Sequence, residues 1–194
     1  NGAIEIPLIG IVTGSITAVI FAEMSTLCAA GNKPKAVDIF RKAAEKSACL
    51  LIPTMFYFAV AAESFILFLY SEEYKDSIQP FLIYLAIIPA RIVVYGAAMM
   101  ALGMTREILF RSMIDLLVNA AFCYLFVRAF GYLGAAIGLV ATLYFWTIPY
   151  NLHKIAEGFG VHWTHLLPWK ELMAISAIGL VSTVPALLVI HGLQ

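Results

Sequence analysis

The sequence predicts an all-α, polytopic membrane protein. Of its 194 residues, 62% are hydrophobic and only 12% are charged, whereas a soluble domain has about 25% charged residues. The mean hydropathy is +0.92, and the apolar residues form runs of about 20, the length that crosses a bilayer as a helix. Twelve basic residues balance twelve acidic ones, so no net charge favours a nucleic-acid partner. This composition excludes a soluble enzyme, a disulfide-rich secreted module and a nucleic-acid binder.

Six apolar stretches are long enough to span a membrane, and we expect residues 1–194 to form a single transmembrane helical bundle. Strands of an outer-membrane barrel would be shorter and would alternate polar with apolar residues. The chain starts at Asn1 with no signal peptide, so we expect it to be a segment of a longer protein. The predicted spans are residues 6–30, 46–70, 78–102, 108–130, 133–153 and 172–191.

The loop between the first two spans is cationic and amphipathic. Pro34 lies where a helix start tolerates proline, and apolar residues follow at helical spacing, opposite charged ones. One interpretation is a surface helix lying on anionic lipid, and the other is a solvated cytoplasmic linker. The apolar positions are Ala36, Val37, Phe40, Ala43 and Ala44. Because five residues make a weak apolar face, the pattern does not choose between them.

The cations of the loops assign the two sides of the membrane. The first, third and fifth connections hold nine of them, whereas the second and fourth hold only Lys75 and Arg128. The positive-inside rule therefore predicts that the first, third and fifth connections are cytoplasmic. The nine cations are Lys33, Lys35, Arg41, Lys42, Lys46, Arg106, Arg111, Lys154 and Lys170.

Charged residues inside the spans are the candidate functional residues. A charge at the bilayer centre costs at least about 2.5–3.5 kcal/mol on insertion scales, and it usually faces a bundle interior or a water-filled path. Arg91 lies near the middle of the third span. Glu23 and Asp115 lie in the predicted cytoplasmic half, Glu63 lies nearer the outer face, and Arg128 lies at an outer helix end.

Helical spacing places two of these residues on polar stripes. In the third span, Arg91 lies between Tyr84 and Tyr95 on one face, and in the fourth span Asp115 and Asn119 follow Arg111 at intervals of four. Arg91 and Asp115 either line a hydrophilic cavity or form a structural ion pair that joins the two helices. Alternatively, Asp115 pairs with Arg111 on its own helix.

Glycines and aromatic residues characterise the remaining elements. Gly10 and Gly14 in the first span, and Gly134 and Gly138 in the fifth, have the GxxxG spacing that favours close helix packing. The connection before the sixth span is rich in aromatic residues, which favour the membrane interface: His162, Trp163, His165 and Trp169. The sequence contains no Walker A, GxSxG or HExxH motif, so we expect neither enzymatic activity nor a cofactor.

Three segments resemble the polysaccharide biosynthesis flippases, the O-antigen type members of the multidrug/oligosaccharidyl-lipid/polysaccharide exporter superfamily. They are GNKPKAVDIFRKAAEKSACLLIP from Gly31, LFLYSEEYKDSIQPFLIYLAIIPARIVVYGAAMMALGMTRE from Leu67 and FGYLGAAIG from Phe130. The features that carry the resemblance are Tyr74, Ser77, Ala101, Gly103, Arg106, Gly131, Gly134, Ala135 and Ala136.

The resemblance implies a two-bundle transporter of the bacterial inner membrane, of which this chain forms most of one bundle. Its substrate would be an undecaprenyl-pyrophosphate-linked oligosaccharide, carried by alternating access. Its partners would be that lipid-linked oligosaccharide, membrane lipids and the N-terminal half of the same protein.

A drug or metabolite/cation antiporter of the same superfamily is the alternative function, and coupling to protons or sodium stays open. A non-transporting membrane scaffold is a third class. The expected substrate path contains Glu23, Glu63, Tyr84, Arg91, Tyr95, Asp115 and Asn119.

Overall fold

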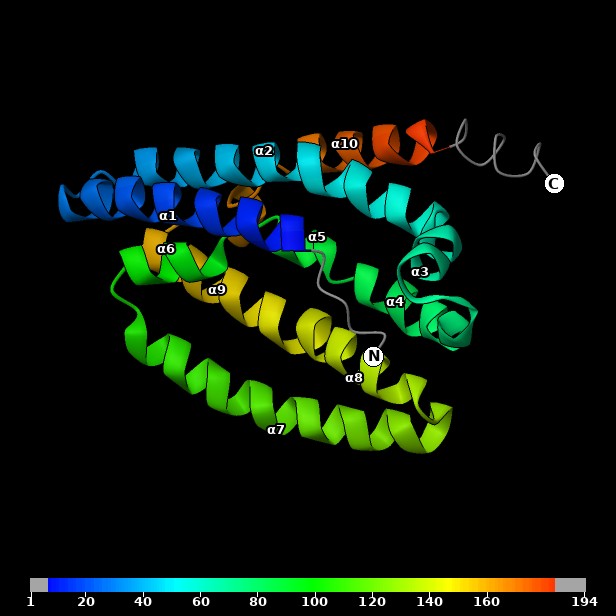
Figure 1. Cartoon of the computed structure of the whole chain (residues 1–194). Coiled ribbons are helices and arrows are strands. Elements are labelled where there is room, and N and C mark those ends of the chain that lie inside the picture. The colour runs from blue at the N-terminus through cyan, green and yellow to red at the C-terminus, as the bar shows by residue number, and fades with distance from the viewer. Residues whose placement is uncertain (1–6, 184–194) are drawn as a thin grey trace.

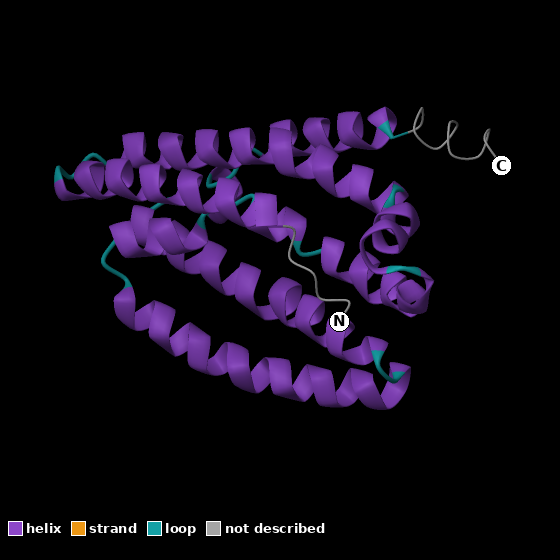
Figure 2. Cartoon of the chain, in the orientation of Figure 1, coloured by secondary structure: helices purple, strands orange, loops and turns teal. Residues whose placement is uncertain are grey.

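The computed structural model describes residues 7–183, and every regular element in that range is a helix (Figures 1 and 2). The all-α prediction is therefore confirmed. The elements are α1 (Pro7–Ala29), α2 (Lys33–Val60), α3 (Ala62–Tyr70), η1 (Glu72–Ser77), α4 (Ile78–Leu85), α5 (Ile88–Arg91), α6 (Tyr95–Ala101), α7 (Thr105–Phe130), α8 (Leu133–Thr142), η2 (Leu143–Thr147), α9 (Ile148–Phe159), η3 (Trp163–His165) and α10 (Trp169–Ser182).

Fewer spans are complete than the sequence predicts. Within the described range, three helical stretches are long and apolar enough to cross a membrane: Lys33–Val60, Thr105–Phe130 and Leu133–Phe159. A fourth is counted if the bent pair Glu72–Leu85 and Ile88–Ala101 forms one span. The count of six is thus not confirmed, and the end of the predicted sixth span lies outside the described residues.

The amphipathic segment after Asn32 is the first part of α2, so it is neither a surface helix on lipid nor a solvated linker. The Asn32 side chain accepts a hydrogen bond from the Lys35 amide and caps the helix. The apolar face packs inside the protein, where Ala36 and Phe40 are both 0% exposed. The helix continues past Pro53 to Val60. Both interpretations failed because the weak apolar face is covered by other helices rather than by lipid or water.

The predicted third span is broken twice. The helix ends at Leu85, resumes at Ile88 and again at Tyr95, and its two halves meet at 42°. Pro89 lacks an amide donor and therefore favours a break at this point. At the break, the carbonyl of Ala86 accepts a hydrogen bond of 2.8 Å from the Tyr144 hydroxyl. The continuous stripe from Tyr84 to Tyr95 is thus wrong, because the two residues lie on different helices.

The packing of α7 against α8 depends on glycine. A Cβ at Gly134 would lie 2.2 Å from the backbone of Phe126, and one at Gly138 would lie 2.8 Å from that of Cys123. The predicted role of this GxxxG pair in close packing is therefore confirmed. In the first span the same spacing has no such role at Gly14, where a Cβ would meet no described atom within 4 Å.

The helices form successive layers (Figure 1). The long helix α7 lies at one side, α8 and α9 run next to it, α4 and α6 follow, and α1, α2 and α10 form the opposite side. The α1–α2 and α6–α7 turns lie at the same end of the bundle. There the Lys33 ammonium donates a 2.9 Å hydrogen bond to the carbonyl of Gly158. The first, third and fifth connections therefore share one end, as the predicted topology requires.

Candidate functional site

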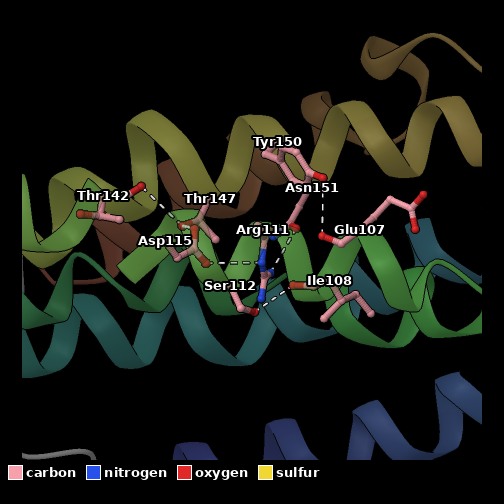
Figure 3. A network of polar contacts seen from close by, with 9 residues as sticks. All are labelled: Glu107, Ile108, Arg111, Ser112, Asp115, Thr142, Thr147, Tyr150 and Asn151. Carbon is pink, nitrogen blue, oxygen red and sulfur yellow. Dashed lines mark hydrogen bonds and ion pairs between the residues drawn. The ribbon is translucent and has the colours of Figure 1, made fainter. Parts of the chain in front are cut away.

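A seam of polar side chains joins α7 to the middle of the fifth predicted span (Figure 3). Asp115 lies at its centre. Its Oδ2 lies 3.4 Å from Nε of Arg111, one turn earlier on α7, and its Oδ1 accepts a 3.0 Å hydrogen bond from the Thr147 hydroxyl. Both charged side chains are mostly buried, at 21% and 25% exposed. The carboxylate therefore has both a cationic partner and a hydrogen-bond donor within the protein.

The Arg111 guanidinium also reaches across to α9. Its NH1 group donates a 3.1 Å hydrogen bond to Oδ1 of Asn151, which is 0% exposed (Figure 3). The Tyr150 hydroxyl lies 3.5 Å from the Glu107 carbonyl beside it. The amide Nδ2 of Asn151 has no hydrogen-bond partner among the described residues. The arginine thus bridges two helices that are far apart in the sequence.

The seam continues one turn further along α7. The Asn119 amide donates a 3.4 Å hydrogen bond to the Thr142 hydroxyl, which itself donates to the carbonyl of Gly138. Cys123 follows, with its sulfur 3.6 Å from Oδ1 of Asn119. The polar stripe that the sequence predicts on the fourth span is therefore real, and it faces the fifth span.

The π-helical segment η2, Leu143–Thr147, gives the seam its geometry. A π-helix contains one residue more per turn than an α-helix would at that point, and such segments are frequent at functional sites. It presents Thr147 to Asp115, while Tyr144 reaches the bend of the third span. One irregular turn therefore contacts both neighbouring helices.

The structure decides the partner of Asp115. Of the two that the sequence leaves open, the ion pair forms with Arg111 on the same helix. The predicted ion pair between the third and fourth spans is thus wrong, because the polar stripe of α7 packs against η2 and α9 and not against the third span. Arg91 is partly buried and ends α5, at the bend of the third span.

The remaining predicted site residues lie apart from the seam. Glu23 is exposed on α1, and Glu63 is an exposed partner of Lys75, with 3.5 Å between Nζ and Oε1. The Arg128 guanidinium lies 4.7 Å from the ring centroid of Tyr124. Glu63 therefore has a local partner at the start of its helix, and the structure does not bring it to Arg91.

Tyr84 and Tyr95 flank the bend from either side. Tyr84 is partly buried on α4, whereas Tyr95 starts α6 and lines a cavity together with Tyr144. The structure thus keeps Tyr95 and Arg91 in the same broken region of the third span, without the single stripe that the sequence predicts.

Sequence reasoning missed three seam residues, namely Thr142, Thr147 and Asn151. All three lie in the predicted fifth span, and a buried asparagine in an apolar span is an unusual feature. A search of that span for polar residues would have found them, whereas a search for charges alone could not.

Comparison with known proteins gives one family. Residues 4–79 match polysaccharide biosynthesis proteins. The match confirms the resemblance inferred from the sequence. It extends from α1 to the start of α4, whereas the seam lies beyond it. Comparison with curated proteins and with solved structures found no significant match. Residues 4–79 are thus similar to polysaccharide biosynthesis proteins, and the described part of the chain contains helices long and apolar enough to cross a membrane.

Proposed function

We propose that this chain is part of a flippase for surface polysaccharide biosynthesis. It would move undecaprenyl-pyrophosphate-linked oligosaccharide repeat units, as in O-antigen synthesis, across the bacterial inner membrane by alternating access. The match of residues 4–79 to polysaccharide biosynthesis proteins carries the proposal. The long apolar helices support it, because a lipid-linked substrate has to be moved within the bilayer.

The proposed partners are the lipid-linked oligosaccharide, membrane lipids and the N-terminal half of the same protein. We propose no enzymatic step and no cofactor, since translocation breaks no bond. Coupling to a proton or sodium gradient is compatible with this scheme.

Within this proposal Arg91 is the cation that binds the pyrophosphate. A guanidinium is a planar, permanently charged donor that suits phosphate oxygens. Arg91 lies where the third span bends, with Tyr95 on the next helix. Arg111 belongs to the seam, where it contacts Asp115 and Asn151. Asp115 and Asn119 then shape the path by holding α7 in place.

The test is translocation by the full-length protein in proteoliposomes that contain a labelled lipid-linked oligosaccharide. Lectin added outside measures how much of the glycan crosses the bilayer. We expect rapid crossing with the wild type and a large loss with Arg91→Ala, partly restored in Arg91→Lys. Crossing no faster than in empty liposomes would refute the flippase. Full activity of Arg91→Ala at normal abundance would remove Arg91 from the mechanism.

A drug or metabolite/cation antiporter is the second candidate, and the exposed carboxylate of Glu23 on α1 favours it. A carboxylate in a water-accessible path suits exchange of an organic cation for a proton. Efflux of a cationic dye from the same proteoliposomes, driven by a proton gradient and lost in Glu23→Gln, would support this candidate. Glycan crossing without dye efflux would exclude it.

A further inference from the structure

A cavity of about 530 Å³ lies between the bend of the third span, α9, α2 and α10. Its volume falls in the range of about 300–1,000 Å³ found for ligand sites. Apolar side chains make up most of its wall, among them Ile52, Phe56, Ile148, Leu152, Leu172 and Met173. Such a wall suits a hydrocarbon ligand and disfavours a sugar or an ion.

Specific contacts fix the positions of the helices that surround this cavity. On one side, α10 packs against α2 at Gly179, where a Cβ would lie 3.0 Å from the Phe56 ring. On the other side, the hydrogen bond from Tyr144 to Ala86 fixes η2 against the bend. The hydroxyl of Ser176, which lines the cavity, donates to the Leu172 carbonyl within its own helix. The cavity therefore has fixed walls and offers few free polar groups.

One end of the cavity has the features of a membrane interface. Leu167 and Trp169 line it, and the Trp169 ring packs edge-to-face on Trp163 at 6.3 Å. Trp is enriched where hydrocarbon meets lipid headgroups. The next residue, Lys170, is exposed. The cations of the loops assign this end to the cytoplasmic side, where anionic headgroups attract basic residues.

We propose that the cavity binds one acyl chain of an anionic phospholipid from the cytoplasmic leaflet, with its headgroup beside Trp169 and Lys170. The apolar wall accounts for the acyl chain, and the adjacent indole and ammonium account for the headgroup. The bound lipid fills the space between α9 and α10 and stays with the protein. The proposal concerns a resident lipid, so it does not depend on which substrate the protein carries.

The test uses the full-length protein in nanodiscs with phosphatidylglycerol that carries a photoreactive diazirine on its acyl chain. We expect crosslinks on the peptides that contain Met173 and Tyr144. Ser176→Phe places a ring in the cavity and should reduce this labelling several-fold. Ala177→Phe is the matched control, because it adds the same ring at the neighbouring, exposed position of α10, and it should label like the wild type.

The headgroup is tested separately. Lys170→Gln should reduce labelling by phosphatidylglycerol several-fold relative to a neutral-headgroup analogue, whereas Lys170→Arg should not. Equal labelling of the Ser176→Phe and Ala177→Phe variants would overturn the proposal. It would also be overturned if a polyprenyl phosphate probe labelled the cavity and phosphatidylglycerol did not, or if no lipid probe reached it. Translocation of the oligosaccharide is measured in parallel, so failure of this proposal is distinguishable from failure of the proposed function.

Discussion

The helices α2 and α7 are of similar length, 28 and 26 residues, yet they are held in the protein in opposite ways. One face of α2 is buried, and it includes Phe40 and Leu51. None of the 26 described residues of α7 is buried, and many of its apolar side chains, such as Leu116 at 72% exposed, point away from the bundle. It is held by glycine contacts and by the polar seam. The comparison shows that apolar residues mark the core in α2 and the outer surface in α7.

The largest effect should come from removing the close approach of α7 and α8. Gly134→Leu should abolish correct assembly, because even a Cβ would overlap the Phe126 backbone at 2.2 Å. The measurement is the yield of monodisperse protein after extraction in mild detergent. Gly96→Ala is the control, since nothing lies within 4 Å of its added methyl group. Equal yields for both variants would show that α7 does not need the glycine contact.

The next effect tests the apolar face of α2. Phe40→Ala should lower the free energy of unfolding by about 3–5 kcal/mol, because it empties a site that is 0% exposed. Unfolding in increasing concentrations of a denaturing detergent measures the change. The exposed Leu50 of the same helix supplies the control: Leu50→Ala should have a much smaller effect. A small loss for Phe40→Ala would mean that this face is not packed as described.

A smaller effect should follow from cutting the seam. Arg111→Gln leaves the Asp115 carboxylate without its cation in a largely apolar setting. We therefore expect the free energy of unfolding to fall by about 1–3 kcal/mol. Asp115→Asn in the same background should cost little more, since the two residues form one pair. A double-mutant cycle reads this coupling. The effects of Arg91→Gln and Asp115→Asn on the free energy of unfolding should instead be additive. Coupling between these two substitutions would show that Arg91 and Asp115 form the ion pair predicted between the third and fourth spans.

The smallest effect should come from the outer surface of α7. Leu116→Ala should change the free energy of unfolding by less than about 0.5 kcal/mol, because the side chain makes few contacts inside the protein. Thermal unfolding in nanodiscs measures this difference. A loss as large as that of Phe40→Ala would show that another part of the full-length protein covers this face.

The sequence predicted the straight elements well and the broken ones poorly. The first and fourth spans were predicted as residues 6–30 and 108–130, and they form Pro7–Ala29 and Thr105–Phe130. Hydropathy and length are sufficient for such helices. They cannot say whether Pro89 bends or breaks a helix, because the outcome depends on a donor such as Tyr144 that lies 55 positions further along.

The candidate site shows the same limit. Spacing placed Arg111, Asp115 and Asn119 correctly on one face of α7, because that face depends on the helix alone. The partners of this face depend on which helix lies opposite. Periodicity carries no information about neighbours, so Thr147 and Asn151 became visible only in the structure.

The contact between Lys33 and Gly158 has a consequence for the order of assembly. The two residues are 125 positions apart, and a ribosome adding about 5–20 residues per second needs roughly 6–25 s to cover that distance. During this interval the α1–α2 hairpin is inserted while the acceptor for its lysine does not yet exist. The newly made hairpin must therefore wait with this ammonium bound to water or lipid phosphate, and the bond can close only after the fifth span has been inserted.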